Sequence, residues 1–239
     1  MKALILCAGR GKRLRPLTDK IPKPLVEINN KSLLERILEQ LEYFNINDIY
    51  LLVGYKKELI KERLKGKFER LNITYIHNPF HSKLNNLFSV WLSKPYLRGQ
   101  DFLLINADIV FDDIILKKAI DSKLGNFCVI DVTKPLPEDS MKVKIKGNSI
   151  VDFGKELKGG DGYTVGIHRF SKEGSKIFLD EIEDMLEKEK DDYHHGAMLN
   201  IVDKYGFDQK ALTIKDLLWC EIDEFVDIKK AEKVFSAEN

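Results

Sequence analysis

The stretch ALILCAGRGKRL occupies residues 3–14, and PKPL follows at residues 22–25. An unbroken apolar run that ends in a glycine-rich, basic loop predicts a buried strand of a parallel sheet followed by an anion-binding turn. Gly9 and Gly11 let the backbone turn tightly and bring its N–H groups toward an anion. Lys23 is held between two prolines, so its ammonium group is placed at a set point. The loop therefore predicts a polyanionic ligand, such as a phosphate chain.

Apolar runs and helical patterns alternate through the first half of the chain. Strands are expected over residues 3–7, 49–53, 73–76 and 102–105, and helices over residues 33–44, 57–64 and 87–93. Unbroken apolar strands separated by helices predict an α/β fold, doubly wound around a mostly parallel sheet. In such sheets the ligand site lies at the carboxyl ends of the strands.

The pattern changes after about residue 125. Shorter strands are expected over residues 127–132, 141–146, 149–153 and 163–168, with Gly and Asn in the turns between them. They predict a small antiparallel β platform beside the main sheet. A long amphipathic helix is expected over residues 172–189, with Ser171 as its N-cap. A last strand that ends at residues 221–223 and a helix over residues 226–235 close the chain.

Composition limits the class of protein and its partners. The chain has 239 residues, 44% hydrophobic and 32% charged, so we expect one globular domain. Lys and Arg number 39 and Asp and Glu 38, which gives no electrostatic reason to expect a nucleic-acid partner. No apolar stretch has the length of a membrane span, so neither membrane insertion nor a compartment other than the cytoplasm is expected. Three widely spaced cysteines favour neither a disulfide framework nor a zinc site.

The loop after the first strand fits neither of two common phosphate motifs. Leu14 stands where the dinucleotide fingerprint GxGxxG has its third glycine, and the GK[ST] of a P-loop is absent. A Rossmann oxidoreductase is therefore disfavoured. The longer pattern GxGxR…PKPL resembles the signature of the sugar-phosphate nucleotidyltransferase superfamily. The resemblance implies that an acceptor phosphate oxygen attacks the α-phosphorus of a nucleoside triphosphate and that pyrophosphate leaves.

The same resemblance implies roles for residues of the loop and beyond it. Arg13, Lys23 and Asp108 are the expected catalytic residues, with Lys23 stabilising the transition state. The residues expected to bind the nucleotide are Leu6, Ala8, Gly9, Gly11, Lys12, Asn78, Asn85, Asn86 and Ser89.

Acidic residues at two strand ends predict a metal site. Asp108 follows the buried strand at residues 102–105, and Glu221 and Asp223 alternate on one face of the last strand. Hard oxygen ligands suit Mg²⁺, which shares phosphate oxygens with its protein ligands. We therefore expect Asp108 to bind Mg²⁺ together with Glu221 or Asp223, of which Asp223 is preferred. The alternative for Asp108 is a turn or cap residue, whereas Asp112 is expected to cap the following helix.

The stretch NNLFSVWL at residues 85–92 points to the base. It resembles a branch of cytidylyltransferases that act on phosphocholine, inositol phosphate, aminoethylphosphonate or phosphoglutamine. Amide side chains can pair with the edge of a pyrimidine, so CTP is the favoured nucleotide. In the alternative interpretation, Asn85 and Asn86 cap the helix that follows them. The runner-up is a hexose-1-phosphate uridylyl- or thymidylyltransferase, against which the Asn-Asn motif argues. An alternative of another class is a non-catalytic nucleotide-sensing subunit, which should have lost Lys23 or Asp108, and both are present.

The second half of the chain resembles the acceptor-binding part of the same branch. We expect a single domain over residues 1–239, with a nucleotide-binding half at 1–125 and an acceptor-binding half at 126–239. A small phosphorylated acceptor and a nucleoside triphosphate are the expected partners, and a homodimer is left open. The residues expected at the acceptor are Lys142, Lys155, Tyr163, His194 and His195. The histidine pair stands where the resembling enzymes carry an acidic residue, and it would bind a phosphate or carboxylate or simply begin a helix.

Overall fold

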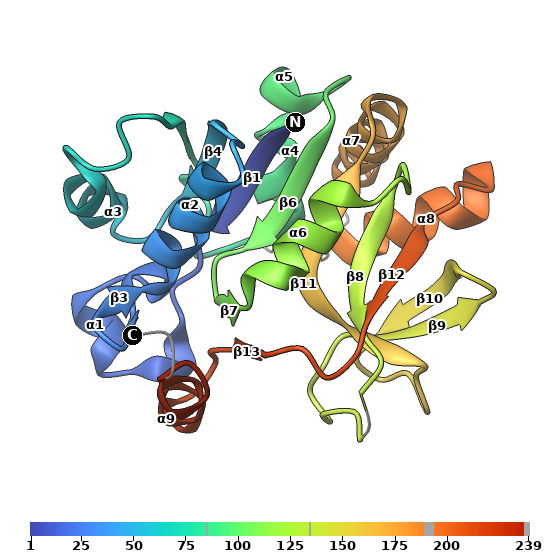
Figure 1. Cartoon of the computed structure of the whole chain (residues 1–239). Coiled ribbons are helices and arrows are strands. Elements are labelled where there is room, and N and C mark those ends of the chain that lie inside the picture. Colours follow the sequence, from blue (N-terminus) through green and yellow to red (C-terminus); the bar gives the residue numbers. More distant parts are fainter. Residues whose placement is uncertain (85, 134, 189–193, 237–239) are drawn as a thin grey trace.

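The computed structural model describes residues 1–84, 86–133, 135–188 and 194–236, and Figure 1 shows the arrangement of their elements. A central sheet runs through the molecule with helices on both of its faces. Among the described residues the sheet has nine strands, in the order β5-β4-β1-β6-β11-β8-β12-β10-β9. These strands are β5 (Asn72–His77), β4 (Asp48–Val53), β1 (Lys2–Cys7), β6 (Phe102–Asn106), β11 (Gly162–Phe170), β8 (Phe127–Asp131), β12 (Lys210–Ile214), β10 (Ser149–Gly154) and β9 (Lys142–Lys146).

The sheet is parallel in its first half and mixed in its second. Strands β5, β4, β1 and β6 are all parallel to one another. Strand β11 runs antiparallel to both β6 and β8, and β8 and β12 are parallel. The β9–β10 hairpin is antiparallel, and β9 also pairs with β11. The doubly wound α/β class with a small antiparallel platform is confirmed, and the platform is continuous with the main sheet.

Helices cover both faces because the central strands, such as β1, β6 and β8, are apolar on both sides. Three helices pack on one face: α2 (Leu33–Tyr43), α3 (Lys57–Leu64) and α6 (Asp113–Asp121). Four pack on the other: α4 (Asn86–Trp91), α5 (Lys94–Leu97), α7 (Lys172–Glu187) and α8 (His194–Tyr205). Neighbours in β1 alternate between the two cores, with Ile5 in the first and Leu4 in the second, and both are fully buried.

The winding direction reverses between β1 and β6. From β1 the chain proceeds to β4 and β5, and it then returns to place β6 on the other side of β1. Loops that leave neighbouring strands at such a point diverge, so their ends form a crevice for a ligand. The basic loop after Cys7 and the carboxylate of Asp108 both follow these two strands. The fold therefore brings together the two segments that the sequence singled out.

The end of the chain returns to its beginning. Strand β13 (Trp219–Glu221) pairs antiparallel with β7 (Ile109–Phe111), and α9 (Phe225–Val234) follows. Residues of α9 share a third apolar core with Ile28 of the short strand β2 (Glu27–Ile28), which pairs with β3 (Lys31–Ser32). Figure 1 shows α9 beside α1 (Leu17–Lys20) and β3. The last elements of the second half thus pack against the first half.

Local sequence signals account for several helix boundaries. Ser171 accepts a hydrogen bond from the backbone N–H of Gly174 and caps α7, as expected. Asp112 likewise caps α6, because its Oδ1 accepts the N–H of Ile114 at 2.8 Å. Strand β12 and helix α5 carry weaker patterns and were not predicted.

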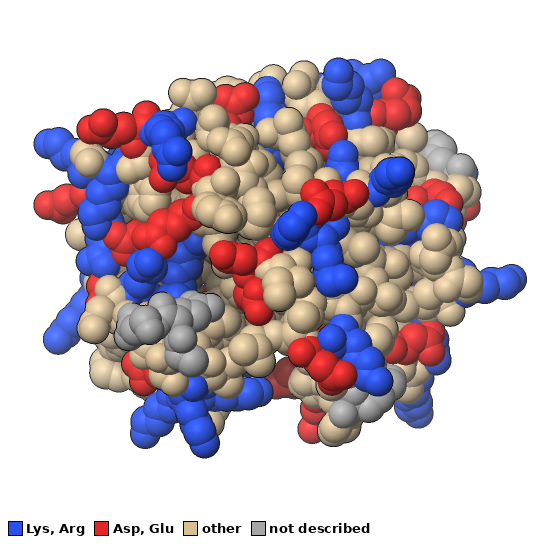
Figure 2. All heavy atoms as spheres, viewed as in Figure 1, with Lys and Arg blue, Asp and Glu red and all other residues tan. Residues whose placement is uncertain are grey.

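The surface agrees with the balanced composition. On the face that Figure 2 presents, positive and negative side chains are interspersed. Within the described ranges, every helix is too short or too polar to cross a bilayer.

Candidate active site

The glycine-rich loop packs closely against the side chain of Lys23. Gly11 has a φ of 66°, a left-handed conformation that favours glycine, and it begins a 3-10 turn over Lys12–Leu14. A Cβ atom on Gly11 would lie 2.9 Å from the Cβ of Lys23, which is too close. Thr18 Oγ1 donates to the Gly11 carbonyl at 2.8 Å, and the Tyr55 hydroxyl donates to the Thr18 carbonyl at 3.0 Å. The loop is therefore held in shape by contacts from three directions.

Lys23 lies between two carboxylates. Its Nζ donates to Asp108 Oδ2 at 2.8 Å and to Asp223 Oδ1 at 2.7 Å, and its side chain is only 11% exposed. Burial alone would lower the pKa of Lys23, but the two carboxylates outweigh it and raise the pKa above its usual range. Arg13 pairs with the other oxygen of Asp223. Lys23 is thus a fixed positive charge beside the basic loop.

Three acids converge next to Lys23. The carboxylate oxygens of Asp108, Glu221 and Asp223 lie within 4.8 Å of one another. A backbone bond of 2.8 Å from the N–H of Ile222 to the Asp108 carbonyl joins the two segments that carry them. Burial and the charges of the two aspartates raise the pKa of Glu221 to about 7. The cluster holds more negative charge than Lys23 and Arg13 neutralise.

This cluster fits a hard divalent cation. Asp108 Oδ1 is buried and has no hydrogen-bond partner among the residues that the structure describes. A buried polar atom without a partner is costly, by about 1–3 kcal/mol. Carboxylate oxygens are also the ligands that Mg²⁺ prefers. The donor set and the unpaired oxygen of Asp108 therefore suit the metal expected from the sequence, and both Glu221 and Asp223 are within reach of it.

A cavity of about 190 Å³ opens at the carboxyl ends of β1 and β6. Its wall includes five of the residues expected at the nucleotide: Leu6, Ala8, Gly9, Asn86 and Ser89. The other lining residues are Leu52, His81, Leu84, Asn106 and Asp108. Gly11 and the exposed Lys12 lie in the adjacent loop. Asn85 lies outside the described residues.

Asn78 supports this cavity from behind. It is fully buried, and its Oδ1 accepts the backbone N–H of Phe80 at 2.8 Å. Its Nδ2 donates to the hydroxyl of Ser89 at 2.7 Å. Both ends of the amide are thus engaged within the protein. Contrary to the expectation that it binds the nucleotide, Asn78 positions Ser89, which does line the cavity.

Asn86 caps a helix other than its own. Its Oδ1 accepts the N–H of His194, the first residue of α8, at 2.9 Å. The alternative interpretation placed a cap on the helix that Asn86 begins, whereas the bond crosses to a helix 108 residues later. Because an N–H can be accepted only by the oxygen of the amide, the Nδ2 of Asn86 is the end left to face other groups.

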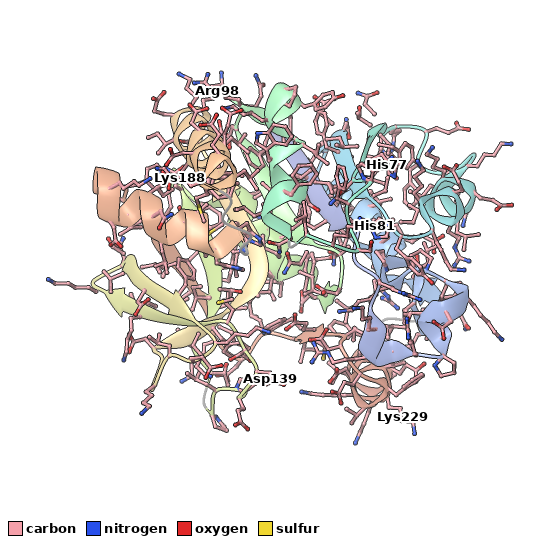
Figure 3. The ribbon with its side chains drawn as sticks, turned by 180° about the vertical axis from the view of Figure 1, so that it is seen from behind. His77, His81, Arg98, Asp139, Lys188 and Lys229 are labelled. Atoms are coloured by element: carbon pink, nitrogen blue, oxygen red, sulfur yellow. The ribbon has the colours of Figure 1, made fainter. Side chains whose placement is uncertain are left out.

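A second cavity of about 230 Å³ adjoins the first. The two share Asn86, Asn106 and Asp108. The second is also lined by Arg13, Asp139, Met141, Lys155, Thr164, Val165, Gly166, His194, His195, Glu221 and Asp223. Figure 3 shows His81, from the first cavity, and Asp139, from the second, on opposite sides of the molecule's central region. The three acids therefore border a space to which both halves of the chain contribute.

Two of the expected acceptor residues lie elsewhere. Lys142 does not line this cavity, because its Nζ donates to the carbonyls of Glu138 at 2.6 Å and Lys155 at 2.7 Å. It holds two neighbouring loops together. Tyr163 packs against Trp219 in a tilted arrangement, with ring centroids 5.4 Å apart, and lines an adjoining cavity of about 330 Å³. That cavity shares Arg13, Asp139, Glu221 and Asp223 with the second one.

The histidine pair reaches the second cavity in an uncharged state. His194 is fully buried and His195 is 7% exposed. Burial lowers the pKa of His194 well below its ordinary value and that of His195 to about 4. At neutral pH the pair therefore brings no positive charge to a phosphate. Its nitrogens can offer hydrogen bonds or lone pairs instead.

Other residues at the cavities were not selected from the sequence. Among them are His81, Asn106, Asp139, Thr164 and Gly166. Asn106 carried a usable signal, since it is a polar residue at the carboxyl end of a buried strand. The others lie on loops or strands whose facing direction depends on distant packing.

A doubly wound sheet with a basic, glycine-rich loop at its switch point defines a nucleotide-binding α/β protein. Residues 2–135 match the family described as nucleotidyl transferase, and this chain belongs to that family. The superfamily expected from the loop motif is confirmed.

Two curated relatives differ in how much of the chain they cover. The bifunctional protein GlmU of Methanococcus maripaludis is 40% identical over 115 residues, or 48% of this chain and 26% of that protein. The chain spans only 26–41% of the length of such bifunctional relatives. The CTP:phosphoglutamine cytidylyltransferase of Campylobacter jejuni is 29% identical, with 96% of this chain and 98% of that protein covered.

A solved structure shares the fold over the whole chain. The inositol-1-phosphate CTP transferase of T. maritima superposes with a TM-score of 0.84 at 24% identity. The match covers 98% of this chain and 94% of that one. The antiparallel strands and the terminal helix are thus part of a recurring architecture.

Proposed function

We propose that this protein is a cytidylyltransferase, which joins CTP to a small phosphorylated acceptor with Mg²⁺ and releases pyrophosphate. One observation carries the proposal. Asp108 borders both cavities, and Lys23 contacts it while packing against the glycine-rich loop. A nucleotide in the first cavity and an acceptor in the second would therefore meet beside Lys23 and the three acids.

The chain's own charges suit in-line transfer at the α-phosphorus. The acceptor phosphate oxygen forms the new bond to the α-phosphorus, and the bond to the β-phosphate oxygen breaks, so pyrophosphate carries away the electron pair. In this proposal Lys23 and Arg13 stabilise the negative charge that develops on the phosphates. Because Lys23 is already fixed by two carboxylates, little reorganisation is needed when the substrates bind.

Asp108, Glu221 and Asp223 are the proposed ligands of Mg²⁺. A bound magnesium ion neutralises phosphate charge and lets two anionic substrates approach. The residues also keep each other in place without the ion, since Lys23 bridges two of them and Asp227 accepts the N–H of Asp223 at 2.9 Å.

The choice of CTP rests on the donors that line the first cavity. Asn86 presents its Nδ2, and Ser89 contributes a hydroxyl. Cytosine offers two neighbouring acceptors, N3 and O2, whereas uracil carries a hydrogen on N3. A donor that faces N3 pairs with cytosine and opposes uracil. The mismatch costs about 1–3 kcal/mol, so we expect CTP to exceed UTP by at least about tenfold.

The acceptor we propose is a small phosphate or phosphonate ester. Arg13 and Lys155 bring positive charge to the second cavity, and Asp139 adds a negative charge beyond those of the three acids. This mixture suits a phosphate at one end and a polar or cationic group at the other. Support also comes from the relative that is similar over nearly its whole length, whose name specifies phosphoglutamine. Phosphocholine and inositol phosphate belong in the same panel of compounds.

Pyrophosphate release measured with four triphosphates against this panel tests the proposal. We expect release only when CTP, a phosphorylated acceptor and Mg²⁺ are all present. Equal or better use of UTP or dTTP with a hexose 1-phosphate would overturn the cytidylyl assignment and favour the sugar-phosphate alternative. If none of the triphosphate–acceptor pairs releases pyrophosphate, the nucleotide-sensing alternative is favoured.

A pair of variants isolates the role of Asn86. Asn86→Asp keeps an oxygen for the N–H of His194 but replaces the Nδ2 donor, so we expect the preference for CTP over UTP to fall by about fivefold or more. Asn72→Asp makes the same change at an exposed position on β5 and should leave the preference unaltered. An unchanged preference in Asn86→Asp would remove Asn86 from base recognition.

A further inference from the structure

A second cluster of metal-ligating side chains is made of residues other than the three acids, although both clusters contribute to the wall of the second cavity. It consists of His168 on β11 and of His194 and His195, the first two residues of α8. One ligand atom from each lies within 4.8 Å of the others, and all three residues are buried. The ring centroid of His168 lies 5.3 Å from that of His194 and 5.2 Å from that of His195. Residues far apart in sequence thus place three imidazoles around one point.

The ring nitrogens of this cluster are short of partners. Within the described part of the chain, His168 Nε2 and both nitrogens of His194 and His195 are buried without a hydrogen bond. Each unpaired buried polar group costs about 1–3 kcal/mol. Five such atoms on three neighbouring rings are a large penalty for a packing role alone. A ligand that accepts electron pairs from nitrogen would relieve it.

The nitrogens are in the form that binds metals. Burial lowers the pKa values of all three histidines, and each is neutral at pH 7. A neutral imidazole has one free lone pair, and it competes with no proton for a metal ion. Cys128 does not compete with the histidines as a thiolate ligand, because burial raises the pKa of its thiol to about 12.

Cys128 and Gln209 form a second layer behind His168. The Nδ1 of His168 lies 2.9 Å from Cys128 Sγ, and Gln209 Nε2 donates to the same sulfur at 3.3 Å. In the tautomer whose Nδ1 carries the proton, Nδ1 donates to the sulfur and Nε2 presents its lone pair to the cluster. Metal-binding histidines are commonly oriented by such a contact at their other nitrogen.

We propose that His168, His194 and His195 bind a divalent transition-metal ion of the zinc type through three nitrogens, with an open position toward the second cavity. The direction of the open position follows from the cavity wall, to which His194 and His195 both contribute. Zinc–nitrogen bonds of about 2.0–2.1 Å place tetrahedral nitrogens about 3.4 Å apart, so small side-chain rotations close the site. Metal binding here does not depend on which nucleotide or acceptor the enzyme uses.

The histidine site differs from the proposed magnesium site in its ligands, which are imidazole nitrogens rather than carboxylate oxygens. Nitrogen ligands suit zinc, nickel, copper and cobalt, whereas Mg²⁺ demands oxygen and keeps its water. Excess Mg²⁺ therefore occupies the three acids and leaves the histidines for a transition metal. The two sites can be titrated independently in one protein.

The test is a zinc titration of the chelator-stripped full chain in excess Mg²⁺, against a chromogenic zinc indicator. We expect one equivalent of Zn²⁺ to bind tightly, and His195→Asn to weaken its binding at least 100-fold. Co²⁺ should give the visible absorption of a low-coordinate nitrogen site in the wild type and lose it in the variant. The absence of stoichiometric binding, or equal binding by His195→Asn, would overturn the proposal.

Matched variants separate this site from others. His77→Asn alters an exposed histidine at the end of β5, which Figure 3 shows away from α8, and should leave zinc affinity unchanged. Glu221→Gln should also leave zinc affinity unchanged. If zinc instead bound at the three acids, this variant would lose it. Cys128→Ser should weaken binding about tenfold by disturbing the orientation of His168. An effect of His77→Asn or Glu221→Gln equal to that of His195→Asn contradicts the assignment.

Discussion

Two ion-pair clusters in this molecule are built from similar residues but are balanced differently. The first surrounds Glu35 on α2, which is 6% exposed. Its carboxylate accepts from Ser32 Oγ at 2.6 Å, from Arg63 Nε at 3.0 Å and from Lys67 Nζ at 2.7 Å. Burial would raise the pKa of Glu35, but these partners outweigh it and lower the pKa to about 2. Every oxygen of Glu35 is satisfied.

The second cluster, around Lys23, is not satisfied in this way. Asp108 Oδ1 is buried without a partner among the described residues, and burial together with like charges raises the pKa of Glu221 to about 7. A network whose polar atoms are all paired stabilises the fold, whereas one that holds excess charge is suited to bind something. The comparison predicts that changes at Lys23 and Asp108 affect turnover and that changes at Glu35 affect stability.

The largest expected effect is that of Lys23→Ala. Loss of this preorganised charge should lower turnover by roughly 10²-fold or more. Pyrophosphate release by the folded variant, with circular dichroism as a check of the fold, measures it. Lys20→Ala removes an exposed lysine from α1 and should behave like the wild type. Near-normal turnover in Lys23→Ala would remove Lys23 from the mechanism.

Asp108→Asn should have the next largest effect. The variant keeps the size of the side chain but loses a charge from the proposed metal site, so we expect metal-dependent turnover to fall by roughly 10²-fold. A titration of activity with Mg²⁺ should show a weaker apparent affinity. Asp112→Asn preserves a capping side chain on α6 and serves as the control. Wild-type magnesium dependence in Asp108→Asn would contradict the metal assignment.

Gly11→Ala tests the contact between the loop and Lys23. The added Cβ would lie 2.9 Å from the Cβ of Lys23, and the φ of 66° is unfavourable for alanine. We expect turnover to fall about tenfold, because a small misplacement of a catalytic group reduces the rate strongly. Gly66→Ala has a similar positive φ but open space around its Cβ, so it carries the backbone strain without the clash. Equal activity in the two variants would show that the contact is unimportant.

Glu35→Gln should leave turnover unchanged and reduce stability by about 1–3 kcal/mol. The folded pKa of about 2 lies below the ordinary value of 4.5, so the ionised Glu35 stabilises the protein above about pH 4.5. This stabilisation is lost as the pH falls from 4.5 toward 2. Urea unfolding at several pH values should show a shallower acid loss in the variant. Glu39→Gln, at an exposed position on the same helix, is the control, and an equal effect of both would contradict the comparison.

Local features of the sequence predicted most of the first half of the fold. The helix expected over residues 57–64 is observed as Lys57–Leu64, and the strand expected over 102–105 is observed as Phe102–Asn106. Here the apolar period and the breakers agree with the tertiary environment. Strand β12 escaped prediction because its place inside the sheet comes from pairing with β8 and β10, and its own pattern is short.

Single side chains were harder to place than elements. Lys142 and Asn78 have the residue types of ligand-binding groups, yet their polar atoms are engaged within the protein. The direction of a side chain depends on which carbonyl or hydroxyl lies nearest in space. That partner can be close in sequence, as for Asn78 and Phe80, and still be invisible in a motif.

The sequence by itself determined the glycine-rich loop, and it predicted an anionic ligand and the acids that could hold a metal, because each depends on residue types at short spacing. Tertiary structure alone decided that Lys23 lies between Asp108 and Asp223, which are 85 and 200 residues away. It also decided that His168 joins a histidine pair at the start of α8. Short-range patterns record the conformation of a segment, whereas these contacts arise only when the sheet is assembled and its strands take their order.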